Sequence, residues 1–233
     1  MTPFEEITTL EDKERYMYAI KIIVISNIAI LAASIMGVMS ASGFPQWLTP
    51  LLVVIFGIFV PLYFIQVYVE RPLPVESLLW RPIGRITIVN GLKLGLLMHA
   101  LNLILSRTYE IVSRLPINDG TNQSEIIRMF EAYAPYVIVS SLIIAPIFEE
   151  LIFRDAIQRF VFPSYEWLGI LASCTFFSLV HMPDNVAMFI TYALLALPLA
   201  WVYRKTGNLQ LVIIAHSVNN FFSLLPLIVR ALS

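Results

Sequence analysis

Two adjacent carboxylates, Glu149 and Glu150, lie in the segment APIFEELIFRDAIQRF, inside one of the most apolar neighbourhoods of the chain. Glu150 precedes Arg154 by four residues, which is the favoured order for an ion pair within one helix, so we expect Arg154 to neutralise Glu150. Glu149 lies about 100° further around the same helix and remains free. A free carboxylate in a poorly solvated place can take a proton from water and return it later, which is general acid–base chemistry. Pro146 precedes Glu149 and predicts a kink that would open space beside it.

Two of the three histidines could join Glu149 in such chemistry. FSLVH places His181 four residues after a phenylalanine, and HSVNN places His216 four residues before Asn220, so each pair shares one helix face. Hydrolysis of a peptide bond needs a base, a group that holds the water, and donors that face the developing oxyanion. We assign these tasks to Glu149, to His181, and to His216 with Asn220. A competing interpretation makes all these polar groups structural links between packed helices.

The composition places these charges in a membrane. Of the 233 residues, 58% are hydrophobic and 13% are charged, and the mean hydropathy is +0.79, whereas soluble domains have about 25% charged residues. A charge at the centre of a membrane helix costs roughly 2.5 to 3.5 kcal/mol, so the charges around Glu149 must face inward, pair, or line a wet cavity. The net charge of -1 argues against a nucleic-acid partner. The single cysteine, Cys174, excludes an internal disulfide and a four-cysteine metal site.

A hydropathy window of about 19 residues predicts an all-α fold, a polytopic transmembrane helix bundle of about seven spans, with six or eight as alternatives. The expected spans cover residues 19–41, 47–69, 86–106, 134–158, 166–182, 186–203 and 209–230. Most are separated by short polar turns such as SGFPQW, and a Pro-rich loop, VERPLPVESLLWRPIGR, follows the second span. We expect a single membrane domain over residues 19–233 and a cytoplasmic or interfacial amino-terminal segment over residues 1–18.

Positively charged residues are distributed unevenly between the two sides of these spans. The side of the amino terminus carries nine, namely Lys13, Arg15, Lys21, Arg71, Arg81, Arg85, Arg159, Arg204 and Lys205. The opposite side carries four, namely Arg107, Arg114, Arg128 and Arg230. Because cytoplasmic loops are enriched in Lys and Arg, we predict an integral multi-pass membrane protein with a cytoplasmic amino terminus. With seven spans, the carboxyl terminus would lie outside.

Three motifs follow one another on separate expected spans: EELIFR at residues 149–154, FSLVH at 177–181 and HSVNN at 216–220. In this order they resemble the EExxxR, FxxxH and HxxxN motifs of the CAAX-prenyl-protease and bacteriocin-processing family, also called the Abi family, of intramembrane peptidases. The neighbouring FRDAIQ and TGNLQLVIIAHSVNN are also similar to that family. The resemblance covers about residues 140–225, with one departure at Asp155, where the family usually has glycine.

The resemblance implies that Glu149 is the general base, that His181 assists the water, and that His216 and Asn220 form the oxyanion site. The expected ion pair of the neighbouring glutamate and arginine would support this arrangement. The resemblance also implies a glutamate peptidase without metal or other cofactor. The alternative is a zinc-dependent peptidase with Glu149, His181 and His216 as ligands, although the chain lacks the HExxH helix of many zinc peptidases.

The substrate that follows from this assignment is a peptide precursor or a membrane-associated protein, cleaved near the cytoplasmic face of a bacterial cell membrane. Besides substrate and lipid bilayer, a membrane signalling protein is a further expected partner. Two other functions compete with the peptidase. One is a non-catalytic membrane protein that binds a partner or confers bacteriocin immunity. The other is a proton-coupled transporter with Glu and His as a relay, which predicts an inverted repeat that the sequence does not display.

Overall fold

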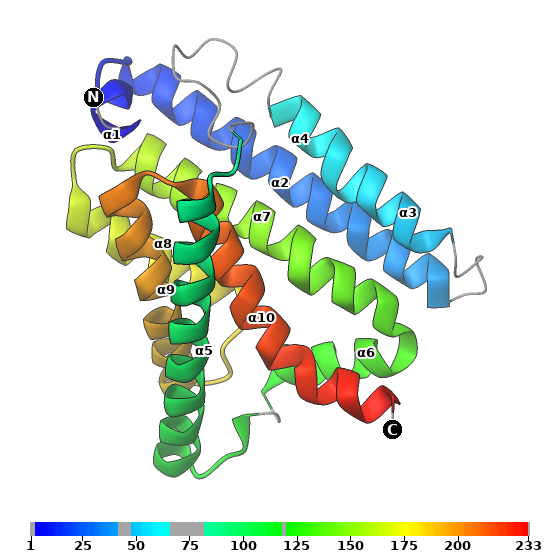
Figure 1. Cartoon of the computed structure of the whole chain (residues 1–233). Helices are drawn as coiled ribbons and strands as arrows, with labels where there is room; N and C mark the ends of the chain where they lie inside the picture. The colour runs from blue at the N-terminus through cyan, green and yellow to red at the C-terminus, as the bar shows by residue number, and fades with distance from the viewer. Residues whose placement is uncertain (1–2, 42–47, 66–81, 118–119, 233) are drawn as a thin grey trace.

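The computed structural model describes residues 3–41, 48–65, 82–117 and 120–232, which form helices and connecting loops without any strand. In chain order the helices are α1 (Pro3–Ile7), α2 (Asp12–Ala41), α3 (Thr49–Val54), η1 (Ile55–Phe59), α4 (Val60–Ile65), α5 (Arg85–Ser113), α6 (Thr121–Val139), η4 (Ser140–Ile144), α7 (Ala145–Glu150), η5 (Leu151–Val161), α8 (Glu166–Val180), α9 (Val186–Thr206) and α10 (Leu209–Leu232). The η segments are π-helical and continue the neighbouring α-helices, as in α3–η1–α4. Helix α1 and the end of α10 lie at opposite ends of the bundle (Figure 1).

The all-helical membrane fold predicted from hydropathy is confirmed. Within the described ranges, five helices are long and apolar enough to cross a membrane: Asp12–Ile35, Arg85–Ser113, Thr121–Val161, Val186–Thr206 and Leu209–Leu232. Two shorter apolar helices, Leu51–Tyr63 and Glu166–Val180, correspond to the second and fifth expected spans. The expected turn at residues 42–47, most of the Pro-rich loop, and Arg71 and Arg81 lie outside the described residues.

The amino-terminal segment contributes to the bundle, because α2 begins at Asp12 and not at residue 19. Asp12 and Glu14 lie in the first turn of α2, where negative charge interacts favourably with the helix dipole. Helix α1 buries Phe4 and Ile7. The Phe4 ring packs edge-on against Tyr203 of α9 at a centroid distance of 5.6 Å.

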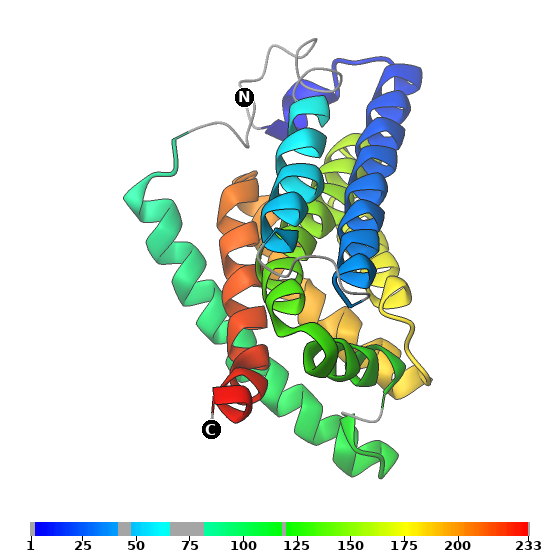
Figure 2. The ribbon, with the colours of Figure 1, turned by 90° about the vertical axis from the view of Figure 1, so that its right-hand side faces the viewer.

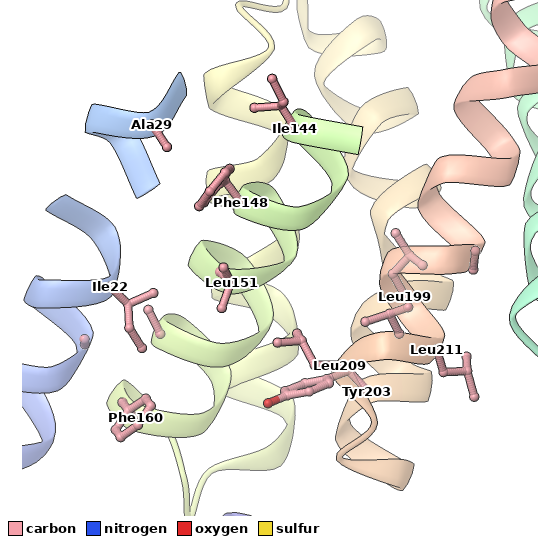
Figure 3. Packing of buried hydrophobic residues seen from close by; sticks show 14 of the residues in the cluster. Ile22, Ala29, Ile144, Phe148, Leu151, Phe160, Leu199, Tyr203, Leu209 and Leu211 are labelled. Atoms are coloured by element: carbon pink, nitrogen blue, oxygen red, sulfur yellow. The ribbon is translucent and has the colours of Figure 1, made fainter. Parts of the chain in front are cut away.

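The segment α7–η5 forms the centre of the bundle and packs against α2, α8, α9 and α10. Every residue from Leu151 to Phe160 is buried, including the charged ones. Figure 3 shows Phe148 and Leu151 from this segment among buried side chains of α2, α9 and α10. A helix enclosed on all sides is the place where buried charges can be paired with protein groups and kept away from lipid.

The sequence predicts a kink at Pro146, and that prediction is wrong, because the helix breaks earlier in the chain. Backbone angles at Tyr133 (φ -157°, ψ 79°) break the helix shortly before Pro135. Proline disfavours helical geometry in the residues before it, which accounts for a break at this point. Near Pro146 the helix instead passes through the π-helical segment η4, which ends at Ile144.

Helix α5 lies on the far side of α10 from α2 and the α3–α4 segment (Figure 2). Its contact with α10 depends on Gly91 and Gly95, which lie four residues apart in GLKLG. A Cβ atom at Gly95 would lie 2.5 Å from Val218 Cβ and 2.8 Å from the carbonyl oxygen of Ala215. Small residues at this spacing allow membrane helices to approach closely. The approach fixes α5 against Ala215 and Val218, which lie one residue before and two residues after His216 on α10.

We predict that Gly95→Val separates α5 from α10, because the larger side chain would overlap Val218 and the Ala215 carbonyl. The expected loss is about 1–3 kcal/mol of stability, typical of an overpacked contact. Thermal unfolding in detergent measures it. Gly84→Ala is the control, because a Cβ atom there meets nothing within 4 Å. Equal melting temperatures for both variants would contradict the assigned contact.

Candidate active site

The expected ion pair between Glu150 and Arg154 is present and fully buried. Arg154 Nε lies 3.0 Å from Glu150 Oε2, and both side chains are 0% exposed. The other oxygen of Glu150, Oε1, lies 2.9 Å from Nδ1 of His216 on α10. Because a carboxylate only accepts, Nδ1 of His216 carries the hydrogen in this contact. The ion pair therefore fixes the orientation of the His216 ring.

The Arg154 guanidinium also connects α7–η5 with the two following helices. Its Nη1 donates to Ser173 Oγ of α8 at 2.8 Å, and its Nη2 donates to the Ala196 carbonyl of α9 at 3.4 Å. The guanidinium carbon lies 5.6 Å from the centre of the Phe177 ring. A buried charge needs this many partners because no water is available to solvate it.

Glu149 differs from its neighbour because it has no basic partner of this kind. Its side chain is 18% exposed, and its Oε2 lies 3.8 Å from Nε2 of His216. That oxygen accepts no hydrogen bond from any described group. Glu149 also lines a large cavity. A carboxylate oxygen with unused acceptor capacity, next to a histidine nitrogen and a cavity, is suited to binding and deprotonating water.

His181 lies at the end of α8 and lines the same cavity. Its Nδ1 lies 2.7 Å from the Phe177 carbonyl oxygen, so Nδ1 carries the hydrogen and Nε2 remains for the cavity. The Phe177 ring stacks on His181 at a centroid distance of 4.4 Å and lies 5.9 Å from the His216 ring. The FxxxH spacing therefore orients His181 through its own helix and brings both histidines to one aromatic ring.

Asn220 lines the cavity with part of its hydrogen-bonding capacity already used. Its Nδ2 donates to the Ser141 carbonyl at 2.9 Å, and its Oδ1 accepts from Asn219 Nδ2 at 3.3 Å. One N–H of the Asn220 amide remains for another acceptor. Asn219, which we did not single out from the sequence, is buried in the same wall, and its Oδ1 has no partner within the described structure. The pair of adjacent asparagines in HSVNN is the sequence feature from which Asn219 could have been identified.

The cavity that joins these residues has a volume of about 940 Å³. Its walls come from α5, the start of α6, η4 and α7, the end of α8, and the middle of α9 and α10. Arg107 lines it at the outer end, where its side chain is 81% exposed. The cavity thus extends toward the end of the bundle opposite α1. With a cytoplasmic amino terminus, this end of the cavity would lie at the opposite face of the membrane.

The short loop after His181 is held by contacts between distant parts of the chain. The Asp184 carboxylate accepts hydrogen bonds from the backbone N–H (2.8 Å) and the hydroxyl (2.5 Å) of Thr121, at the start of α6. Asn185 Nδ2 donates to the Tyr109 hydroxyl of α5 at 3.0 Å, while Asn185 Oδ1 caps α9. These contacts attach the His181 loop to α5 and α6. The sequence offered no signal for Asp184, because its partner lies in another helix.

We predict that Asp184→Asn lowers the melting temperature, because the charge at the start of α6 is lost. The Thr121 hydrogen bonds hold the pKa of Asp184 below its ordinary value of about 3.9. The stabilisation is therefore complete above about pH 4 and disappears only as the pH falls through the lowered pKa of the folded state. Thermal unfolding in detergent should give the same difference between variant and wild type at about pH 6 and about pH 8. A difference that changes between these two pH values would contradict the assignment.

The described residues do not assemble a cluster of three or more His, Cys, Asp or Glu side chains suited to a metal ion. Glu149 and His216 approach each other, but the second nitrogen of His216 is used by Glu150. A zinc site needs at least three protein ligands around one point. The side chains as they lie do not fit the zinc alternative with Glu149, His181 and His216, and we derive no step through a metal.

Comparison with known proteins gives three findings. The sequence model of a family described as Type II CAAX prenyl endopeptidase Rce1-like matches residues 131–222. UPF0177 protein YvdC of Lactococcus lactis subsp. lactis (strain IL1403) is 25% identical over 203 residues, which are 86% of this chain and 74% of that protein. UPF0177 protein YbdI of the same strain is 32% identical over 108 residues, 46% of this chain and 52% of that protein. No solved structure matches the chain.

Proposed function

We propose that this chain, whose residues 131–222 match the Rce1-like family model, is an intramembrane endopeptidase of the CAAX-prenyl-protease and bacteriocin-processing family in which Glu149 activates water. The observation that carries this proposal is the Glu149 carboxylate. Its Oε2 faces His216 at 3.8 Å, beside a cavity of about 940 Å³, and accepts no hydrogen bond from the described residues. The adjacent Glu150 is instead neutralised by Arg154. One acid of the pair is structural, and the other is available for chemistry.

In the proposed reaction, Glu149 accepts a proton from water while the water oxygen bonds to the carbonyl carbon of the substrate. The electrons of the C=O bond move to its oxygen, which becomes the oxyanion. The C–N bond then breaks, and Glu149 transfers its proton to the departing amine. One water molecule is consumed, and a carboxyl and an amino end are formed.

The other polar residues of the cavity support this sequence of events. Nε2 of His181 is available to orient the water, because Nδ1 is bonded to the Phe177 carbonyl. The remaining N–H of Asn220 can donate to the oxyanion. His216 can add a donor through Nε2 when its ring carries both hydrogens, since the Nδ1 hydrogen already faces Glu150.

A bacterial cell membrane fits the two curated relatives, which are proteins of Lactococcus lactis. A prenylated CAAX protein is not expected as a substrate in a bacterium. We therefore propose a peptide precursor or a membrane-associated protein as the substrate class. No cofactor is part of the proposed reaction.

We predict that Glu149→Gln abolishes peptide hydrolysis, because the amide cannot accept the proton of water. Loss of a general base reduces the rate by about 100-fold to 10,000-fold. The assay uses protein purified in detergent and a proteome-derived peptide library, with cleavage sites identified by mass spectrometry. Glu131→Gln is the matched control, since Glu131 lies on the exposed surface of α6 and should remain fully active.

The outcome also separates the peptidase from the alternatives. A Glu149→Gln protein that keeps the cellular phenotype of the wild type would favour the partner-binding or immunity function and would remove the peptidase proposal. Loss of wild-type hydrolysis on treatment with a chelator, with recovery on addition of zinc, would favour the zinc-dependent alternative.

We also predict which face of the membrane reaches the cavity. In a Cys174→Ala background, a membrane-impermeant maleimide should label Arg107→Cys in intact cells, because Arg107 lies at the exposed end of the cavity. It should label Glu11→Cys, between α1 and α2, only after permeabilisation. This pattern follows from the excess of positive residues on the amino-terminal side. The reverse pattern would place the cavity opening in the cytoplasm and the amino terminus outside.

A further inference from the structure

Helix α5 carries a row of polar side chains inside a membrane span. His99, Asn102, Ser106 and Glu110 recur at intervals of three or four residues, so they share one helix face. All four line the cavity that contains Glu149. The opposite face of α5 exposes large apolar side chains, namely Leu97, Ile104 and Ile111. The helix therefore presents one face to lipid and a polar face to the cavity.

The first half of this polar face packs against α10, where the His99 ring lies 5.2 Å from the Phe222 ring, whereas the second half, Ser106 and Glu110, extends along the cavity. Helix α5 packs along α10 and α9 but does not pack along α6 in the part of the chain that the structure describes. The first turn of α6 lines the other side of the cavity with Asn122 and Gln123. Polar groups at membrane depth are costly unless they meet water, each other or a polar ligand. The groove between α5 and α6 is therefore built to hold something polar.

Three hydrogen-bonding groups in the wall of this cavity have no partner within the described residues. They include Nδ1 of His99 and Oδ1 of Asn219, both buried, and Asn219 is only 4% exposed. Other groups of the row are bonded among themselves, such as Asn102 Nδ2 to Ser223 Oγ at 3.1 Å. Unused donors and acceptors in the wall of a cavity indicate the chemistry of the molecule that it binds.

The groove offers neutral amides and hydroxyls and little net charge. Its two oppositely charged residues at the outer end, Arg107 and Glu110, pair with each other at 2.8 Å. Neutral donors and acceptors in a row match a peptide backbone, which has one N–H and one C=O for nearly every residue. From His99 to Glu110 the row is about 16 Å long at 1.5 Å per residue, which corresponds to about five residues of extended peptide.

We propose that the groove between α5 and α6 binds an extended, uncharged stretch of the substrate polypeptide and guides the scissile bond to Glu149. This inference rests on the proposed peptidase function and identifies its substrate class. The stretch lies along the row from His99 to Glu110, with Gln123 on the opposite wall. Its unpaired backbone groups bond to the amides and hydroxyls of the groove, so main-chain recognition dominates over recognition of charged side chains. The substrate enters at the exposed end of the cavity, near Arg107.

The test compares two groove variants with a control on the same helix. Ser106→Leu and Gln123→Leu each remove a polar group from the groove, whereas Thr108→Leu removes an equivalent hydroxyl from the exposed side of α5. Cleavage of the proteome-derived peptide library is measured for each protein. Each groove variant should lose about tenfold in kcat/KM, mainly through KM, as expected for one lost hydrogen bond. Thr108→Leu should have the kcat/KM of the wild type. All three variants should have the melting temperature of the wild type within experimental error, which shows that they are folded.

Binding is measured separately, so that failure of the groove and failure of the peptidase can be distinguished. The probe is a pool of fluorescein-labelled, uncharged decapeptides, and its polarisation is recorded with the Glu149→Gln protein. If the groove variants bind the probe about tenfold more weakly, the proposed peptide-binding groove is supported, whether or not the wild-type protein cleaves the library. Wild-type cleavage that neither groove variant alters would overturn the groove while the peptidase proposal stands. Absence of both binding and cleavage in folded protein would overturn both.

Discussion

The buried ion pair between Glu150 and Arg154 determines how the helices around the cavity are joined. Both side chains are fully enclosed at membrane depth, where a charge without a partner is strongly destabilising. Arg154 distributes its hydrogen bonds over Ser173 of α8 and the Ala196 carbonyl of α9. The other oxygen of Glu150, Oε1, accepts a hydrogen bond from Nδ1 of His216 on α10. One carboxylate and one guanidinium therefore connect four parts of the bundle, and the site is shaped by the same contacts that stabilise the fold.

Helix α5 links this arrangement to the cavity in two ways. Its glycine face lies so close to α10 that Gly91 and Gly95 have no room for a side chain beside Ile214 and Val218. This contact restricts the position of α10, and with it the position of His216. Its polar face lines the cavity. A helix that lies outside the motif-bearing region thus contributes both to the placement of the site and to its access.

The features that could be predicted from the sequence are those that lie within one helix. Hydropathy locates the spans, and the i,i+4 spacing of Glu150 and Arg154 predicts their ion pair, because rotation per residue is constant in a helix. Contacts between helices depend on depth and rotation, which hydropathy does not specify. The hydrogen bonds from Thr121 to Asp184 join residues 63 positions apart and have no local pattern. The break at Tyr133 could not be located from the sequence either, because Pro135 and Pro146 are equally good local reasons for a kink. Which of them bends the helix depends on the packing around α6.

Asp155, the departure from the family pattern, can be explained by its partners. Its Oδ1 lies 2.8 Å from Arg159 Nη1 and accepts a hydrogen bond from the Tyr203 hydroxyl at 2.9 Å. Asp155 and Arg159 are again an i,i+4 pair with the acid first, so the extra acid adds no net charge to the central helix. Asp155 follows Arg154 directly in η5 and bonds to Tyr203 of α9, which separates this pair from the Glu150 pair. In the described part of α7–η5, Glu149 is consequently the one acid without an arginine partner, and that distinction makes it available for chemistry.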